Sequence, residues 1–174
     1  MTGKKFMNAV ANGAIDILGM VLTILEEVGS PYCVIGGLSV NAYVEPVVSL
    51  DLDIVITTKY LEEVCKAGKA KGLKVEHFEH SVNLTASRSD LRVQLQTDPR
   101  YQSFIQRAVK KEVLGYRMNV ASLEDVLQGK VWAYSDGRRR KSKRQKDLAD
   151  IMRLVEAYPS LENQLPKNIK EALK

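Results

Sequence analysis

Two carboxylates placed two positions apart in an apolar run constrain this chain more than any other feature. Asp51 and Asp53 lie in the segment SLDLDIVI, residues 49–56, whose apolar and β-branched residues predict a buried strand. Because side chains alternate between the two faces of a strand, both carboxylates leave the same face. Two negative charges held side by side destabilise a strand unless a metal ion, a lysine or an arginine neutralises them. The segment therefore predicts a cation beside this strand.

Magnesium is the cation that this pattern favours. Mg²⁺ takes oxygen ligands, is commonly held by one or two carboxylates, and completes its shell with water and substrate phosphates. We therefore predict that Asp51 and Asp53 bind Mg²⁺, with Mn²⁺ as the alternative ion. A purely structural domain, in which lysine or arginine side chains neutralise both carboxylates, is a competing interpretation.

A glycine pair precedes the acidic segment. Residues 32–35 predict a short buried strand, Gly36 and Gly37 a tight turn, and residues 38–44 a helix that ends before a proline. Glycine has no Cβ, so backbone amides at such a turn approach phosphates closely, and a helix N-terminus favours anions. Ser39 adds a hydroxyl near the turn. A tight turn with no ligand is the alternative.

The remaining pattern predicts a mixed α/β or α+β fold, with a small β-sheet flanked by helices and a helical C-terminal portion. We divide the chain into a core over residues 1–121 and a helical portion over residues 122–174 packed on it. Further strands are expected over 73–79, 83–87, 91–96 and within 112–120, and helices over about 10–28, 60–70, 98–109, 122–134, 142–157 and, as a short tail, 160–174.

Positive charge is concentrated late in the chain, which carries a formal net charge of +5. The segment 138–144 holds Arg138, Arg139, Arg140, Lys141, Lys143 and Arg144. A cluster of this density attracts polyanions such as nucleic acids, and a solvated loop before a helix is the alternative. The cysteines Cys33 and Cys65 are expected to be buried thiols in a reducing cytosol. With neither a signal peptide nor a membrane-length apolar stretch, we predict a cytoplasmic protein without a membrane partner.

Two sets of motifs resemble a known family. Ile35-Gly36-Gly37, followed after thirteen residues by Asp51-Leu52-Asp53-Ile54, resembles the signature of the nucleotidyltransferase (polymerase-beta-like) superfamily. Residues 130–133 (KVWA) and 144–151 (RQKDLADI) resemble the AbiEii/AbiGii toxin branch, in which a lysine on one helix and a Lys-Asp-x-x-Asp segment on another flank the site. Together these features span residues 32–154.

The resemblance implies Mg²⁺-dependent transfer of a nucleoside monophosphate from an NTP to an RNA, protein or small-molecule acceptor, with pyrophosphate leaving. It also implies a toxin–antitoxin context with a cognate antitoxin. The implied roles are metal binding and catalysis by Asp51 and Asp53, phosphate binding by Gly36, Gly37 and Ser39, neutralisation of phosphate charge by Lys130, and a further polar contribution from Asp147. Alternatively, Lys130 is a solvated helical lysine, and Asp147 and Asp150 are surface carboxylates that pair with nearby lysine and arginine side chains.

One departure from the family pattern weakens the implied catalysis. The third carboxylate of the superfamily normally lies on a later strand, where this chain has Gln94, and an amide supplies an oxygen but neither a charge nor a base. A missing unit charge at about 4 Å corresponds to roughly 4 kcal/mol at an effective dielectric constant near 20, or about a thousandfold in rate. Asp90 and Asp98 would replace it only in a shifted register, and Val48 stands where the toxin branch commonly has an arginine. The alternative is therefore a catalytically silent module that binds nucleotide or nucleic acid through segment 138–144.

Overall fold

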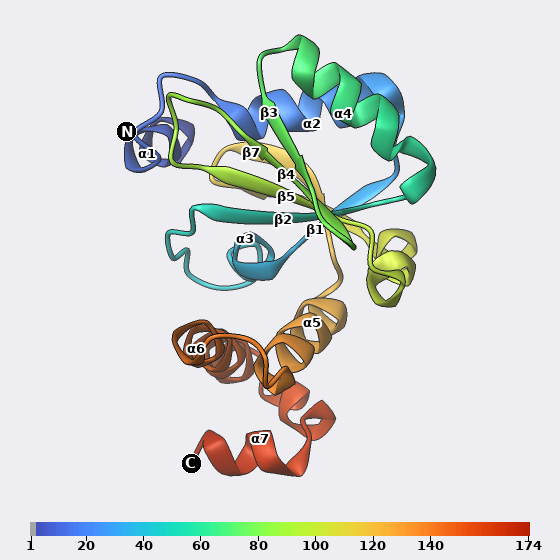
Figure 1. Ribbon diagram of the computed structural model, residues 1–174. Helices are drawn as coiled ribbons and strands as arrows, with labels where there is room; N and C mark the ends of the chain where they lie inside the picture. Colours follow the sequence, from blue (N-terminus) through green and yellow to red (C-terminus); the bar gives the residue numbers. More distant parts are fainter. Residues whose placement is uncertain (1–2) are drawn as a thin grey trace.

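Seven strands form one mixed sheet in the computed structural model, which describes residues 3–174 (Figure 1). The strand order is β3-β4-β5-β2-β1-β7-β6. Strand β2 lies inside the sheet, antiparallel to β1 and parallel to β5. The bounds are β1 Tyr32–Ile35, β2 Asp51–Ile56, β3 Lys74–His77, β4 Ser81–Thr85, β5 Arg92–Gln96, β6 Val109–Val113 and β7 Tyr116–Val120.

Helices α2 (Ile17–Val28) and α4 (Leu61–Ala70) cover one face of the sheet, and α1 (Gly3–Val10) lies near the chain start (Figure 1). The apolar residues Leu52, Ile54 and Ile56 of β2 are fully buried in the core on this side. Burial of such side chains is the main favourable contribution to folding, so this face fixes the orientation of β2.

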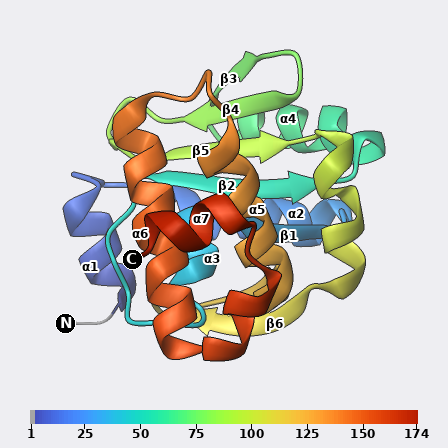
Figure 2. The same ribbon diagram turned by 90° about the horizontal axis from the view of Figure 1, so that it is seen from below.

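The opposite face carries α3 (Gly36–Val40), α5 (Leu123–Ser135), α6 (Lys141–Ala157) and α7 (Lys167–Ala172), which lie in front of the sheet in Figure 2. A second core joins Cys33 and Val55 of the sheet to Leu127 of α5 and Ile151 of α6. Three 3₁₀ segments complete the fold, Thr58–Tyr60, Pro99–Arg107 and Pro159–Gln164. Since residues of β2 alternate, Asp51 and Asp53 leave the sheet on the side of these C-terminal helices.

The structure confirms the mixed α/β fold and the helical C-terminal portion. The division at residues 121 and 122 lies in the connection between β7 and α5, and it stays a prediction. The single N-terminal helix expected over residues 10–28 is wrong, because Asn12 adopts a positive φ of 52° and interrupts it. A new helix then begins at Asp16, whose carboxylate accepts a hydrogen bond from the Gly19 amide at 2.9 Å.

Two other predicted helices differ in extent or type. The helix expected over residues 38–44 begins earlier, at Gly36, and ends at Val40. Beyond it the Asn41 side chain bonds both the N–H and the carbonyl of Val47, at 2.9 and 2.8 Å, and so holds a loop. The segment after Asp98 is 3₁₀ rather than α-helical, although Asp98 caps it as expected.

The two cysteines are buried, as predicted. Cys33 and Cys65 are both buried and free. Burial, with a smaller contribution from the charge of Asp125, raises the pKa of the Cys33 thiol to about 12. Within residues 3–174, no helix combines the length and the apolar character that a membrane crossing needs.

Candidate active site

The register of the sheet brings the acidic strand beside the glycine turn. Asp53 pairs with Ile35 of β1 on one side and with Gln94 of β5 on the other. Gly36 follows Ile35 directly, so the turn begins next to the Asp53 carboxylate. Asp51 and Asp53 therefore share a face of β2, as predicted, and that face is bounded by Gly36 and by Gln94.

Gly36 is the residue whose type this arrangement most strictly requires. Its φ is +70°, and a Cβ built there would lie 2.5 Å from Oδ2 of Asp53. Both the left-handed backbone and the close carboxylate exclude a side chain. Gly37 is less restricted, since a Cβ there would lie 3.4 Å from Ser49 Oγ and 4.0 Å from Lys146 Nζ.

Ser39 does not reach the site in the way the sequence suggested. Its side chain is fully buried, and its hydroxyl donates to the Gly36 carbonyl at 2.7 Å. The hydroxyl therefore holds the turn from within α3, and a contact to phosphate would require that hydrogen bond to break.

Two cations hold the Asp51 carboxylate. Lys143 Nζ of α6 lies 2.6 Å from Oδ2, and the Arg92 guanidinium of β5 lies 2.8 Å from Oδ1. Partial burial raises the pKa of Asp51, but hydrogen bonding and charge attraction from Lys143, then from Arg92, outweigh it and lower that pKa. Arg92 was not identified from the sequence, although its period-two spacing from Gln94 places both on one strand face.

Asp53 lies in a different environment. Burial raises its pKa; Lys130 lowers it through space, and the adjacent Asp51 raises it again. Within the part of the chain that the structure describes, no hydrogen bond or ion pair reaches the Asp53 carboxylate. A partly buried carboxylate without a direct protein partner is a suitable ligand for an added cation.

The donor set fits a magnesium ion that keeps much of its water. Among residues 3–174, three or more acidic, histidine or cysteine side chains nowhere gather in a way that would hold a metal. Asp51 and Asp53 would thus share an ion with water and phosphate oxygens, an arrangement common for Mg²⁺. Gln94, which pairs with Asp53 in register, donates from Nε2 to Ser81 Oγ at 3.0 Å.

A buried ionic network forms the wall opposite the sheet. Lys130 Nζ of α5 lies 3.0 Å from Asp147 Oδ1 and 2.7 Å from Asp150 Oδ2, both on α6. Arg139 contacts Asp147 Oδ2 at 2.7 Å, and Arg153 contacts Asp150 Oδ1 at 2.8 Å. Lys130, Asp147 and Asp150 are only 6%, 1% and 4% exposed. The alternatives of a solvated Lys130 and of surface carboxylates are therefore wrong.

Between the sheet and this network lies a pocket of about 210 Å³. It is lined by residues of β1, β2, β5, α3, α5 and α6, including Gly36, Asp53, Gln94, Lys130, Arg139 and Asp147. Most of the predicted site residues thus meet in one cavity, with Asp51 and Ser49 beside it and Ser39 outside it. Lys146 Nζ lies 3.5 Å from Ser49 Oγ and adds a cation near the turn.

Segment 138–144 divides into inward and outward side chains. Arg139 and Lys143 reach Asp147 and Asp51, and Arg144 donates to the Tyr134 carbonyl at 2.7 Å. Arg138, Arg140 and Lys141 are exposed. The segment is therefore a solvated loop in part only, because Arg139 and Lys143 complete ionic contacts around the site.

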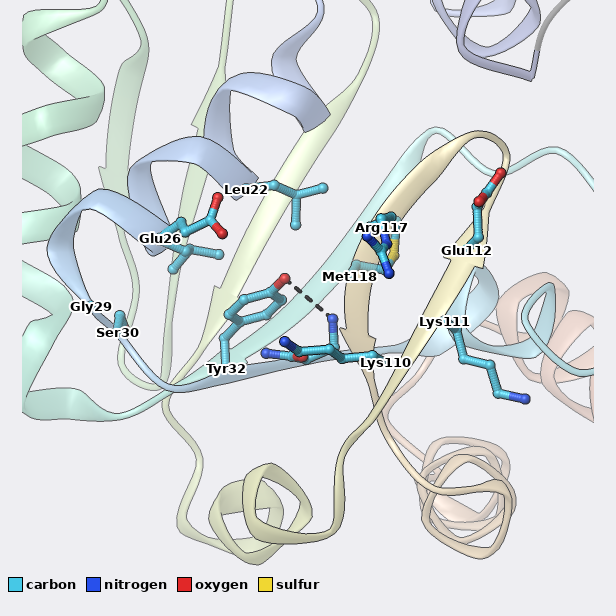
Figure 3. Close-up of a pocket in the computed structure, with 12 residues that line it drawn as sticks. Leu22, Glu26, Gly29, Ser30, Tyr32, Lys110, Lys111, Glu112, Arg117 and Met118 are labelled. Atoms are coloured by element: carbon cyan, nitrogen blue, oxygen red, sulfur yellow. Dashed lines mark hydrogen bonds between the residues drawn. The ribbon is translucent and has the colours of Figure 1, made fainter.

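A second hollow lies away from this site, between the end of α2 and the β6–β7 hairpin (Figure 3). Its volume is about 560 Å³, and Leu22, Tyr32 and Met118 line it together with charged residues of both signs. The Tyr32 hydroxyl accepts a hydrogen bond from the Asn119 amide at 3.2 Å, drawn as the dashed line in Figure 3. This hollow was not predicted from the sequence, because its residues come from distant elements.

Comparisons with known proteins find one matching family model and several solved structures with a similar fold. The family model described as "Nucleotidyl transferase AbiEii toxin, Type IV TA system" matches residues 31–174. No curated protein sequence matches the chain. Among solved structures, ANT(2'')-Ia in complex with adenylyl-2''-tobramycin is similar at 15% identity and a TM-score of 0.64, over 90% of this chain and 94% of that one.

Two further structures are similar at comparable identity. The lincosamide antibiotic adenylyltransferase LnuA, lincomycin-bound, has 14% identity and a TM-score of 0.57, over 79% of this chain and 95% of that one. An antigenic nucleotidyltransferase-like protein from Paracoccidioides brasiliensis has 16% identity and a TM-score of 0.53, over 96% of this chain and 85% of that one. At such identities the likeness shows a shared fold.

Proposed function

This chain belongs to the nucleotidyl transferase AbiEii toxin family, and from that membership and the site geometry we propose that it transfers a nucleoside monophosphate from an NTP to an acceptor with Mg²⁺. The observation that carries the proposal is the juxtaposition of Asp51 and Asp53 with the Gly36 turn. A carboxylate pair there would hold a metal at the place where the turn leaves room for phosphate oxygens.

The reaction is an in-line displacement. An acceptor hydroxyl oxygen forms a bond to the α-phosphorus and loses its proton to solvent, while the bond to the bridging oxygen breaks and pyrophosphate carries away the electron pair. When bound, Mg²⁺ supplies charge neutralisation at the phosphate oxygens. Asp51 and Asp53 would hold the ion, while Lys146 and Arg139 lie close enough to the turn and the pocket to neutralise the remaining phosphate charge.

We keep Lys130 and Asp147 in this proposal as pocket residues, but we assign them an indirect role. Lys130 is held by two carboxylates at 3.0 and 2.7 Å, so it contributes to the potential in the pocket as part of a network. Asp147 in turn orients Arg139 at the pocket wall. Both residues would thus act on the nucleotide mainly through the position of Arg139.

The test is thermal unfolding with and without Mg²⁺ and each of the four NTPs. A ligand that binds only the folded protein raises its stability by mass action. We expect a metal-dependent rise with a preferred NTP, lost in Asp51→Asn and in Asp53→Asn. Transfer of label from an α-³²P NTP to cell RNA or protein should disappear in the same variants. Undiminished transfer in both variants would refute the proposal.

A catalytically silent binding module is the second candidate, and Gln94 beside Asp53 favours it. If only the third carboxylate is missing, Gln94→Asp and Gln94→Glu should raise transfer, whereas a module that never turns over gives none in either variant. Binding through the basic segment is tested by replacing Arg138, Arg140 and Lys141 with alanine. That replacement should flatten the fall of RNA affinity with salt, and an unchanged slope would exclude the segment.

The family description supports a toxin–antitoxin setting. We extend the proposal to a cognate antitoxin as partner and to the cytosol as location, where NTPs are available and the two free cysteines stay reduced.

A further inference from the structure

Both oxygens of Asp51 are already occupied by protein cations. Lys143 Nζ lies 2.6 Å from Oδ2, and the Arg92 guanidinium lies 2.8 Å from Oδ1. A metal ion bound to either oxygen would lie close to the ammonium or guanidinium group already there, and their positive charges would repel. This repulsion favours the departure of one of the two side chains when a metal binds Asp51.

Lys143 is the side chain that is free to move. Arg92 is paired in register with Asp51 on the neighbouring strand, so its backbone fixes it beside the carboxylate. Lys143 belongs to the first turn of α6, 92 positions away in the chain, so no strand register holds it beside Asp51. A lysine ends in a point charge on a flexible four-carbon chain, which allows it to exchange one anion for another.

A new anionic partner for Lys143 would lie within its reach. Lys143 and Lys146 are three residues apart on α6 and hence on one helix face. Lys146 Nζ lies 4.0 Å from the Cβ position of Gly37 and 3.5 Å from Ser49 Oγ. A triphosphate at the glycine turn would therefore present oxygens to both lysines.

We propose that Lys143 is a tethered counter-ion that holds the metal position on Asp51 in the nucleotide-free protein and moves to the triphosphate when the metal–nucleotide complex enters. The proposal rests on the proposed function, since it assumes that Asp51 and Asp53 bind a metal with an NTP. Its consequence is an order of binding in which the divalent ion enters together with the nucleotide and binds poorly alone. Arg92 remains on Asp51 throughout and supplies one of the charges that a second metal would bring.

The experiment measures Mn²⁺ binding without nucleotide, from the loss of the free-ion signal in electron paramagnetic resonance. We expect Lys143→Met to bind Mn²⁺ about tenfold more tightly than the wild type. Lys141→Met is the matched control, because Lys141 is an exposed lysine on the same helical turn. Lys143→Gln serves as the second variant, and thermal unfolding verifies that each variant is folded.

The gain must depend on Asp51 and must reverse when nucleotide is present. Asp51→Asn/Lys143→Met should lose the gain. With an equimolar mixture of the four NTPs, equilibrium dialysis replaces the free-ion signal, because NTPs themselves bind Mn²⁺, and Lys143→Met should then retain less Mn²⁺ than the wild type. Equal Mn²⁺ affinity of wild type and both Lys143 variants without nucleotide would overturn the inference while leaving the proposed function intact. If no protein binds Mn²⁺ even with NTPs, the proposed function itself fails, and the inference with it.

Discussion

Two ionic clusters border the same pocket and differ in how far they are open to water. Around Lys130, one ammonium and two carboxylates are at most 6% exposed. Around Asp51, the carboxylate and its lysine are each 34% exposed, and the arginine 44%. Desolvated charges depend strongly on their partners, whereas exposed pairs contribute little to stability and exchange readily. We therefore expect the cluster around Lys130 to contribute more to folding stability, and the cluster around Asp51 to exchange its partners more readily.

The sharpest way to break this comparison is to remove the buried lysine. Lys130→Met leaves Asp147 and Asp150 in the interior without their shared cation, which should destabilise the fold by about 3–5 kcal/mol. Urea unfolding measures the change. Lys143→Met is the matched variant from the exposed cluster and should alter stability by less than about 1 kcal/mol. Equal losses in the two variants would remove the distinction between the clusters.

Gly36 offers a second test, because its lack of a side chain leaves room for the Asp53 carboxylate next to the cluster around Asp51. Gly36→Ala combines a left-handed backbone with a Cβ placed 2.5 Å from Asp53 Oδ2, and should destabilise the protein by about 2–3 kcal/mol. Gly29→Ala is the control, since Gly29 has nearly the same φ, +68°, and no atom within 4 Å of the added carbon. It should lose only about 1 kcal/mol. If Gly36→Ala lost no more stability than Gly29→Ala, the Asp53 side chain would be able to move away from the added Cβ at no measurable cost.

The two carboxylates of β2 should respond to pH with opposite signs in the metal-free protein. The raised pKa of Asp53 means that its charge opposes folding at neutral pH, and this loss vanishes as the pH falls below the ordinary aspartate value. The lowered pKa of Asp51 means that its charge favours folding above the ordinary value, and this gain is lost as the pH falls through the folded-state pKa.

Asp53→Asn should therefore be more stable than the wild type at pH 7, and Asp51→Asn less stable by about 1 kcal/mol or less. Both differences should shrink toward pH 3. Chemical unfolding with a chelator present, repeated across that range, measures them. If both substitutions raised the free energy of unfolding, or both lowered it, the two carboxylates would not lie in different electrostatic environments.

The smallest effect is expected at the outer end of the basic segment. Arg138 is 94% exposed and lies 3.4 Å from Asp136, so Arg138→Ala should change stability by less than about 0.5 kcal/mol. Its neighbour Arg139 contacts the buried Asp147, and Arg139→Ala should lose clearly more. Thermal unfolding of both variants measures the difference. Similar melting temperatures would mean that the contact between Arg139 and Asp147 adds little to stability.

The parts of the molecule that the sequence predicted well depend on local patterns. The alternation in residues 49–56 was sufficient to place Asp51 and Asp53 on one face, because a strand has period two. Ser122 was predicted as a cap, and its hydroxyl accepts from the Asp125 amide at 3.3 Å. The N-terminal break was missed because apolar spacing continues across Asn12, and only its backbone conformation interrupts the helix.

The partners of the site residues could not be predicted, because they join distant segments. Nothing local connects Lys143 with Asp51, and the contact requires α6 to pack over the face of the sheet. Family resemblance identified Lys130 and Asp147 as flanking the site, but only the packing of α5 against α6 shows that they neutralise each other. Whether Lys130 is solvated or enclosed depends on its burial, and burial depends on how the whole chain folds.

The inner position of β2 has a consequence for motion. With β1 and β5 on either side, we expect its amides to exchange with solvent only in the largest openings of the protein. The first turn of α6 lacks a side-chain cap, and we expect it to fray by small local openings. Each such opening would withdraw Lys143 while the carboxylates stay in place. The rate at which a divalent ion binds the site would then be set by local unfolding of the first turn of α6. It would not depend on the stability of the sheet beneath that turn.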